Sequence, residues 1–283
     1  MTDRRFKIGV VAPGSRIEPE IAEKVIQIAT SLYQDRTPEI CFHPQCFLSS
    51  GHFAGNDTTR CDAFVEIAND ESFDAVWFAR GGYGSCRLID HVLPKLSGEA
   101  RNKHYLGYSD AGSILAALYK ENFTKVAHGP MPADVNRDGG AAAIARVLSY
   151  LLDCDDSSLE ATVSPAKKTA AFNISILSHL LGTPFQPDLS GHVLMLEEIS
   201  EHMYRIDRSL FHITSNPGIR EVAGIMLGRC GNIPSNDPDF GQTEEQVAQH
   251  WCAVAGIPYL GRADIGHDTE NRIVPFGQPL SGR

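Results

Sequence analysis

No apolar run in this chain approaches the ~20 residues of a membrane-spanning helix, and positive charge is scarce. Its 25 lysines and arginines are outnumbered by 35 acidic residues, which gives a net charge of −10. No basic cluster interrupts this acidic excess, so we expect neither a nucleic-acid backbone nor an anionic membrane surface as a partner. A small molecule or a peptide is the expected ligand.

The N-terminus also lacks the pattern of a secretory signal, because its apolar stretch, Ile8–Ala12, ends at a Pro-Gly pair. The 7 cysteines are scattered, and none forms a C-x-x-C pair. This usage is typical of reduced thiols in a cytoplasmic protein. Cys41, His43 and Cys46 lie close together, but no second ligand group follows at the spacing of a zinc site. We therefore expect no metal and no other cofactor.

What the chain does contain is an ordinary globular composition, with 42% hydrophobic residues in a length of 283. That length suits two modest domains. Short apolar runs alternate with amphipathic stretches in the first half, a pattern typical of a parallel sheet covered by helices on both faces. The expected strands are Lys7–Ala12, Glu39–Phe42, Asp74–Ala79, the run ending at Gly107, and Lys125–His128. The expected helices are Glu18–Tyr33, one beginning near Asn56, Arg87–Leu96, one after Ser109, and Gly139–Leu152.

The second half repeats the alternation after a polar stretch rich in proline and lysine, which indicates a linker. Its expected elements are the helices Ile174–Leu181, Tyr204–Ile213 and Glu244–Ala255 and the strands His192–Leu196, Val222–Leu227 and Ile257–Leu260. The predicted fold class is α/β. The predicted organisation is an N-terminal domain of residues 1–152, a linker of 153–168 and a smaller α/β domain of 169–283.

A sharp strand-to-helix turn is expected at Ser109, because a short apolar run ends at Gly107 and helical spacing begins soon after Asp110. Such a turn exposes the side chain beside free backbone N–H groups that stabilise an anion. A nucleophile fits this position. A helix cap also fits, and caps are the commoner case. Ala111 stands where the hydrolase pentapeptide G-x-S-x-G has its second glycine.

Ser15, Gly81-Gly82 and Ser109 all follow the carboxyl ends of predicted strands, where ligands bind in parallel sheets. Paired glycines let the backbone approach a ligand and turn its N–H groups inward. A phosphate loop is disfavoured, because no Lys-Ser/Thr follows. The pattern fits an oxyanion hole built from an N–H of Gly81 or Gly82 and the N–H of Asp110, and it also fits a tight structural turn.

A serine nucleophile requires a histidine with a carboxylate behind it. His267 lies in a polar loop after the last predicted strand and is our first choice among the 11 histidines. His128, at a strand end, is the second choice, whereas His179 is more typical of a helix face. Glu197 directly follows an apolar strand, where it either orients the imidazole or faces water as a strand terminus.

The chain further resembles a known family in a series of motifs that occur in the same order. These motifs are Gly51–Arg60, Ala79–Ser85, Gly107–Asp110, His128–Met131, Leu196–Glu198 with Tyr204–Arg208, and Gly266-His267 with Asn271 and Pro275–Gly277. The family is that of the murein tetrapeptide L,D-carboxypeptidases, whose relatives include the microcin C immunity serine peptidases. The resemblance covers nearly the whole chain.

The resemblance implies a triad of Ser109, Glu197 and His267, completed across the junction of an amidotransferase-like N-terminal domain and the C-terminal domain. It implies a cytoplasmic homodimer that removes the terminal D-Ala from murein tetrapeptides during cell-wall recycling. Such a substrate has a free carboxylate, and Arg80 and Arg205 are our candidates to bind it bidentately.

One departure is visible, since Ala171-Phe172 stands where the family usually has Gly-Gly, and we expect this change to narrow or reshape the pocket. Hydrolysis of peptidyl or aminoacyl nucleotide antibiotics remains an alternative. An aromatic platform in the pocket would favour it, with Tyr83 and Trp251 as candidates. A second alternative is a non-catalytic binding protein, in which Ser109→Ala leaves both ligand affinity and function intact.

Overall fold

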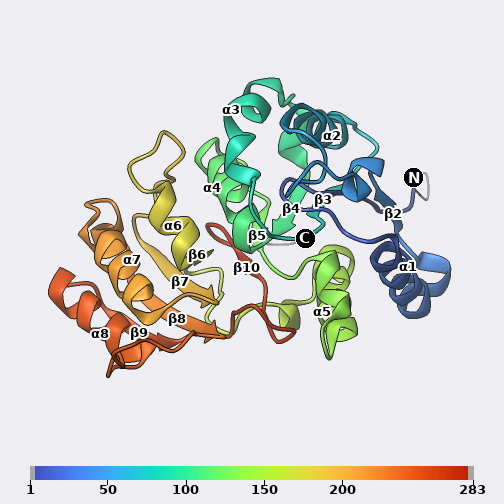
Figure 1. The fold of residues 1–283 in the computed structure, drawn as a ribbon. Helices are drawn as coiled ribbons and strands as arrows, with labels where there is room; N and C mark the ends of the chain where they lie inside the picture. The colour runs from blue at the N-terminus through green and yellow to red at the C-terminus, as the bar shows by residue number, and fades with distance from the viewer. Residues whose placement is uncertain (1–3, 280–283) are drawn as a thin grey trace.

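The computed structural model describes residues 4–279, which form two sheets lying side by side (Figure 1). The first sheet has six strands in the order β10-β5-β4-β3-β1-β2, and all neighbours are parallel except the antiparallel pair of β10 and β5. Its strands are β1 (Lys7–Val11), β2 (Glu39–Phe42), β3 (Ala75–Phe78), β4 (His104–Gly107), β5 (Val126–His128) and β10 (Val274–Pro275).

Helices cover both faces of this first sheet because its strands are apolar on both faces. Trp77 packs in the cluster that includes α1 and α5, whereas its neighbours Val76 and Phe78 pack in the cluster that includes α2 and α4. This is the alternation expected along a strand. The covering helices are α1 (Pro19–Tyr33), α2 (Asp57–Asn69), the short α3 (Ile89–Val92), α4 (Gly112–Lys120) and α5 (Gly140–Leu148).

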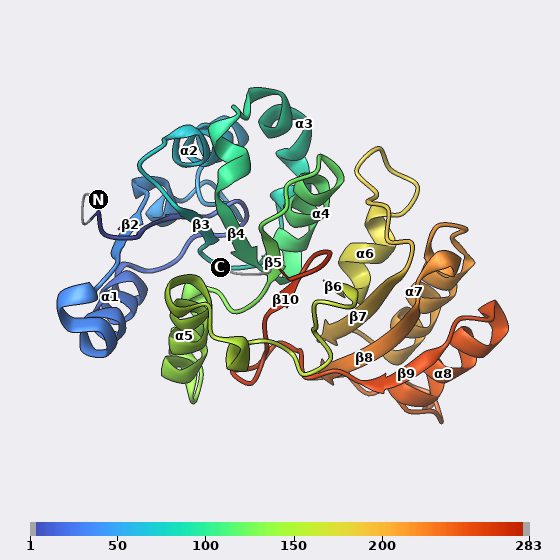
Figure 2. The same ribbon diagram turned by 180° about the vertical axis from the view of Figure 1, so that it is seen from behind.

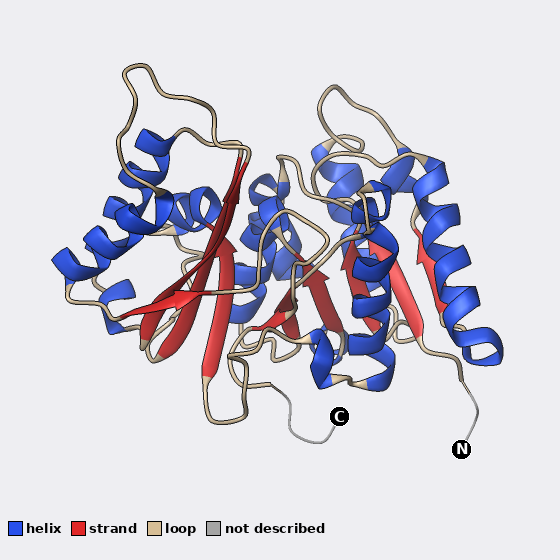
Figure 3. Cartoon of the chain, turned by 90° about the horizontal axis from the view of Figure 1, so that it is seen from below, coloured by secondary structure: helices blue, strands red, loops and turns tan. Residues whose placement is uncertain are grey.

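The second sheet has the parallel order β6-β7-β8-β9. Its helices lie on one face, and loops together with the first sheet occupy the other side (Figure 3). Its strands are β6 (Lys168–Asn173), β7 (His192–Ile199), β8 (Gly224–Gly231) and β9 (Tyr259–Arg262), and its helices are α6 (Ile174–Leu180), α7 (Met203–Ser215) and α8 (Glu244–Ala255). The predicted α/β fold class is confirmed.

Local chemistry explains several element boundaries. Asn56 begins α2 by accepting a hydrogen bond from the Thr59 N–H at 2.8 Å, and Thr243 with Gln246 forms a capping box at α8. The prediction of one helix over Arg87–Leu96 is wrong. The segment is α3 flanked by 3-10 turns, because proline at 94 restricts the residue before it and removes a donor.

Two strands were not expected from the sequence, β6 and β10. The two-residue β10 returns from the C-terminal half to pair with β5, and Gly277 next to it bridges Thr169 of β6. Figure 2 shows β10 beside β5, at the edge of the first sheet that is nearest to β6. The segment predicted as a linker also makes a bridge, between Leu159 and Ile273. The two halves are therefore joined by backbone pairing beside the linker.

Across residues 4–279, none of the helices combines the length and the apolar character needed to span a bilayer.

Candidate active site

Ser109 lies on the turn between β4 and α4, where a 3-10 turn, Ser109–Ala111, joins strand to helix. Its φ is +59°, a left-handed conformation that is uncommon for a residue with a side chain and that clusters at functional sites. The cap position of the turn belongs to Tyr108, not to Ser109. The strand-to-helix turn is present as predicted, and the local helix-cap interpretation of Ser109 is wrong.

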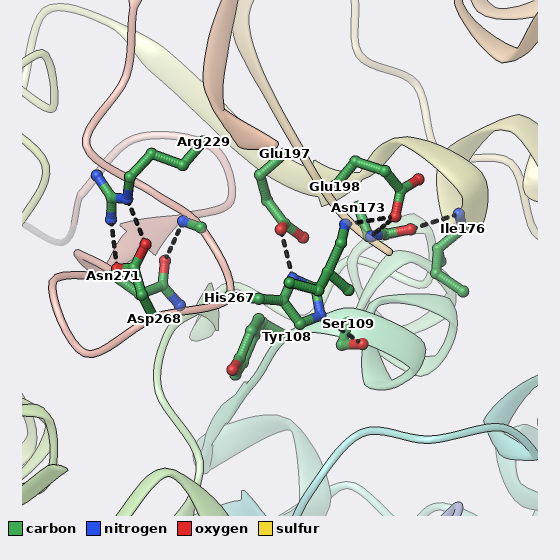
Figure 4. A network of polar contacts seen from close by, with 12 residues as sticks. Tyr108, Ser109, Asn173, Ile176, Glu197, Glu198, Arg229, His267, Asp268 and Asn271 are labelled. Atoms are coloured by element: carbon green, nitrogen blue, oxygen red, sulfur yellow. Dashed lines mark hydrogen bonds and ion pairs between the residues drawn. The ribbon is translucent and has the colours of Figure 1, made fainter. Parts of the chain in front are cut away.

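Ser109, His267 and Glu197 form a line of hydrogen bonds (Figure 4). The His267 Nε2 atom lies 3.0 Å from the Ser109 hydroxyl oxygen. On the other side of the ring, Nδ1 lies 2.5 Å from Glu197 Oε2. The Glu197 side chain is 0% exposed and that of His267 is 8% exposed, so Glu197 is not an acidic strand end facing water.

The environment of His267 sets its protonation. Burial lowers the pKa of His267, but the charge of Glu197 and the hydrogen bond to it outweigh burial, so the pKa lies above its ordinary value. Among the described residues, Glu197 Oε1 has no hydrogen-bond partner. The Tyr108 ring lies against the imidazole, with centroids 4.9 Å apart. The pair is therefore arranged to stabilise an imidazolium in a largely dry site.

Paired glycines lie directly beside the serine. A Cβ atom on Gly81 would be 2.9 Å from the Ser109 hydroxyl oxygen, and one on Gly82, whose φ is +110°, would be 2.5 Å from the Ser15 hydroxyl. Only glycine allows such an approach. The loops after β1, β3 and β4 therefore meet at one place, as the sequence predicted.

Two buried side chains hold these loops together. Asp110 accepts a hydrogen bond from the Ser85 N–H at 2.8 Å. The guanidinium of Arg60, which is fully buried, donates to the carbonyl groups of Pro13 and, at 3.1 Å, Gly84. Sequence reasoning did not single out Arg60, although it lies four residues before the buried Phe64 and thus on the inner face of α2.

A second buried carboxylate, Glu198, follows Glu197 and was also missed as a site residue. It accepts hydrogen bonds from Asn173 Nδ2 at 2.7 Å, from the Ser175 N–H at 2.9 Å and hydroxyl at 2.7 Å, and from the Ile199 N–H at 2.9 Å. Asn173 also caps α6 through the Ile176 N–H at 3.1 Å. Burial raises the pKa of Glu198, and its donors oppose that rise.

The loop that carries His267 is fixed to the first sheet by Asn271. Its Oδ1 atom lies 3.0 Å from His128 Nε2 and accepts the Gly266 N–H at 3.2 Å. His128 is buried at the end of β5, and burial lowers its pKa. His128, the second choice for the base, thus binds the loop that carries the first choice.

Two arginines from different elements bind the same loop. Arg229 of β8 donates to Asp268, the neighbour of His267, at 2.5 and 2.8 Å (Figure 4). Arg146 of α5 donates to the carbonyl groups of Thr269 at 2.7 Å and Asn271 at 3.0 Å. The position of the imidazole therefore depends on both halves of the chain.

A pocket of about 560 Å³ opens at Ser109 and His267. Its lining includes Arg80, which was predicted, and Arg137 with Asp134, which were not. Asp134 lies on the 3-10 turn Pro132–Asn136, which directly follows the family motif His128–Met131, and Arg137 comes at the end of that turn. A size of this kind suits a small ligand rather than a folded protein.

Arg205 and Trp251 are not among the residues that line this pocket. Arg205 lies on α7 and pairs with Glu201 at 3.5 Å. The Trp251 indole donates to Asp207 at 2.8 Å, between α7 and α8. Tyr83 is 52% exposed on the loop after β3 and is likewise absent from the lining.

The departure from the family at Ala171-Phe172 lies inside the core. Both side chains are 1% exposed in β6, and the Phe172 ring lies 5.0 Å from that of Phe276. Neither residue lines the pocket. The side chains of Ala171 and Phe172 therefore do not narrow the pocket by direct contact, contrary to the expectation from the sequence.

The close group of two cysteines and a histidine makes ordinary contacts. The Cys46 thiol donates to the Val10 carbonyl, and His43 Nδ1 accepts the Gln45 N–H. Within the described residues, no group of three or more His, Cys, Asp or Glu side chains is arranged to hold a metal ion.

Comparisons with known proteins agree with this architecture. Residues 8–129 match the model of the LD-carboxypeptidase N-terminal domain, and residues 169–281 match that of the C-terminal domain. The chain belongs to the LD-carboxypeptidase family. Among the similar members is a Bacillus subtilis protein named "Probable murein peptide carboxypeptidase", 27% identical over 283 residues, with 95% of this chain and 86% of that protein covered.

Solved structures of related proteins have the same fold. A muramoyltetrapeptide carboxypeptidase from Oxalobacter formigenes matches with a TM-score of 0.74 at 24% identity, covering 97% of this chain and 96% of that one. The protein MccF in complex with glutamyl sulfamoyl guanosine matches with a TM-score of 0.78 at 14% identity, covering 97% and 92%.

Proposed function

We propose that this LD-carboxypeptidase is a serine peptidase that cleaves the amide bond between an L-centre and a terminal D-Ala in murein tetrapeptides. The observation that carries the proposal is the hydrogen-bonded line from buried Glu197 through His267 to Ser109, at 2.5 and 3.0 Å. A serine needs such a base to become a nucleophile at neutral pH. The named activity of relatives supports the choice of substrate.

In the proposed mechanism, His267 Nε2 takes the Ser109 proton as the hydroxyl oxygen bonds to the scissile carbonyl carbon. Glu197 keeps Nδ1 protonated and stabilises the imidazolium that forms. The imidazolium then gives its proton to the leaving amine of D-Ala, and the carbon–nitrogen bond breaks. Water, deprotonated by His267, hydrolyses the acyl-enzyme and restores the serine.

The oxyanion of the tetrahedral intermediate is assigned to backbone N–H groups of Asp110 and of the Gly81-Gly82 loop. Each donor in such a site contributes about 3–4 kcal/mol to transition-state stabilisation. Two observations support this assignment: Gly81 lies so close to Ser109 that a Cβ atom would be 2.9 Å from its hydroxyl oxygen, and the Asp110–Ser85 hydrogen bond joins the two loops.

We also propose a role in cell-wall recycling in the cytoplasm. All seven cysteines are free, which suits a reducing compartment. The homodimer that the family resemblance implies stays a prediction, and sedimentation equilibrium would test it.

The test is incubation with L-Ala-D-Glu-meso-diaminopimelyl-D-Ala and detection of free D-Ala by mass spectrometry. We expect release by the wild type, none by Ser109→Ala, and no effect of a chelator. Release by Ser109→Ala would contradict the serine mechanism, and loss of release with a chelator would indicate a metal. Cleavage of an aminoacyl sulfamoyl adenylate without release of D-Ala would indicate the antibiotic-hydrolysing alternative.

A further inference from the structure

The charged side chains that line the pocket are mostly basic, although the chain as a whole is acidic. Its charged lining side chains, apart from the base, are Arg80, Arg137 and Asp134, so two cations face one anion in a protein of net charge −10. A positive pocket on an acidic protein favours an anionic group of the ligand. Arg80 and Arg137 could each bind this group, and they differ in how firmly the protein holds their side chains.

The single acid, Asp134, is already engaged by the protein. Its side chain is 5% exposed. Oδ1 accepts hydrogen bonds from the Tyr108 hydroxyl at 2.9 Å and from Arg137 Nε at 2.8 Å, and Oδ2 accepts the Met131 N–H at 2.8 Å. Because both oxygens are used, Asp134 supports its neighbours rather than binding a ligand.

That support fixes Arg137. Donation from Nε to a buried carboxylate sets the plane of the guanidinium, while the Arg137 side chain remains 43% exposed at the pocket. A guanidinium held in one plane binds a carboxylate through two parallel hydrogen bonds and loses less entropy on binding than a free one.

Arg80 lacks comparable support. The hydrogen bond found for it goes from Nη1 to the Arg16 carbonyl at 3.3 Å, which is long for a charge-assisted contact, and its side chain is exposed. Arg205 lies on α7, outside the pocket lining. Of the arginines considered, Arg137 is the one that the fold holds in place.

We propose that Arg137 binds the terminal carboxylate of the peptide substrate, with Asp134 as its positioning residue. The inference rests on the proposed function, because only a carboxypeptidase requires this group. Tyr108 shares Asp134 with Arg137 and directly precedes Ser109. Asp134 therefore connects Arg137 to the residue that precedes the nucleophile, and both Arg137 and Ser109 line the same pocket.

The test compares the tetrapeptide with its C-terminal amide, which lacks the negative charge. Calorimetry in a Ser109→Ala background measures affinity without turnover. We expect the free acid to bind about 10- to 100-fold more tightly than the amide, the range of a charge-assisted contact. Adding Arg137→Gln removes this preference, because it lowers the affinity for the free acid and leaves the affinity for the amide unchanged. Arg137→Lys retains part of the preference.

The matched control is Arg208→Gln, the same loss of charge at an exposed position of α7 outside the pocket, and it keeps the preference. Unchanged affinity for the amide shows that Arg137→Gln still folds. A preference that survives Arg137→Gln, or that is lost with Arg80→Gln alone, would overturn the inference. Failure of the wild type to release D-Ala contradicts the proposed function instead, and the two failures are distinguishable.

Discussion

His128 Nε2 and Asn271 Oδ1 lie 3.0 Å apart and join the first sheet to the loop that carries the base, across 143 positions of sequence. The Gly266 N–H points to the same Oδ1 atom at 3.2 Å. An atom that receives a backbone N–H is an acceptor, so His128 donates its Nε2 proton. The amide of Asn271 thus fastens the His267 loop to β5.

Substitution Asn271→Ala is expected to lower both stability and turnover. It leaves the buried His128 and Gly266 donors unpaired, a cost of about 1–3 kcal/mol in unfolding free energy, and it frees the loop that positions His267. Urea denaturation and the rate of D-Ala release measure the two effects. Asn102→Ala, at an exposed residue, is the control. Wild-type turnover in Asn271→Ala would show that the loop does not depend on this contact.

Substitution Ser109→Ala is expected to lower kcat about a million-fold, the loss seen when a triad nucleophile is removed. Affinity for the peptide remains, because the pocket is unchanged. Ser113→Ala, four residues later in the first turn of α4, keeps activity and serves as the control. Normal function in Ser109→Ala would instead support the non-catalytic binding protein.

Substitution Glu197→Gln retains the shape of the side chain but loses its charge. We expect kcat to fall about 10,000-fold, as when a triad acid becomes an amide and the imidazole takes the wrong tautomer. Stopped assays of D-Ala release measure it. The control is Glu201→Gln, four residues later and outside the pocket lining, and its kcat should differ little from that of the wild type. Near-normal kcat in Glu197→Gln would remove Glu197 from the mechanism.

The pH dependence follows from the raised pKa of His267. Only the neutral imidazole accepts the serine proton, so kcat/KM falls as the pH drops through that pKa, at a pH above the ordinary histidine value of 6.5. In Glu197→Gln the effect of burial, which lowers the pKa of His267, is no longer outweighed by the charge of Glu197. The fall of kcat/KM on the acid side of the pH profile therefore moves to lower pH. A limb at the same pH in both proteins would contradict the Glu197–His267 coupling.

Substitution Gly81→Ala places a Cβ atom 2.9 Å from the Ser109 hydroxyl oxygen. The loop or the serine must shift, and we expect kcat to fall about 100- to 1,000-fold, the effect of losing an oxyanion donor. Gly98→Ala, where a Cβ meets nothing within 4 Å, is the control. If Gly81→Ala kept full activity, the loop would have no role in the oxyanion hole.

Much of the fold could be predicted from local patterns. The 3.6-residue period of α1 and the continuous apolar runs of β3 and β7 can be recognised from residues that are close in sequence. Helix α8 was predicted with its observed bounds, Glu244–Ala255. Strand β10 was not predictable in this way. Two residues carry no period, and β10 exists only because β5 offers it a free edge.

The candidate site likewise contains features that local sequence predicted and features that it did not. The turn at Ser109, the glycine pair beside it, the carboxyl-end position of Glu197 and the polar loop of His267 follow from short-range sequence, and the family resemblance implied that the three side chains form a triad. The partners of Arg60, Glu198 and Asn271 do not, because each of these side chains binds residues brought near by sheet order and loop packing. The contact of Arg137 with Asp134 is local, but the position of Arg137 at the pocket is not.

The sequence by itself determined which elements form and which residue types stand at their ends, since backbone sterics, side-chain period and capping act within a few residues. Only the tertiary structure decided that His128 anchors the base loop instead of acting as the base, that Arg205 lies outside the pocket and that Arg137 lines it. Those outcomes depend on distances between segments that are far apart in sequence, 143 positions for His128 and Asn271, and no local pattern encodes such distances.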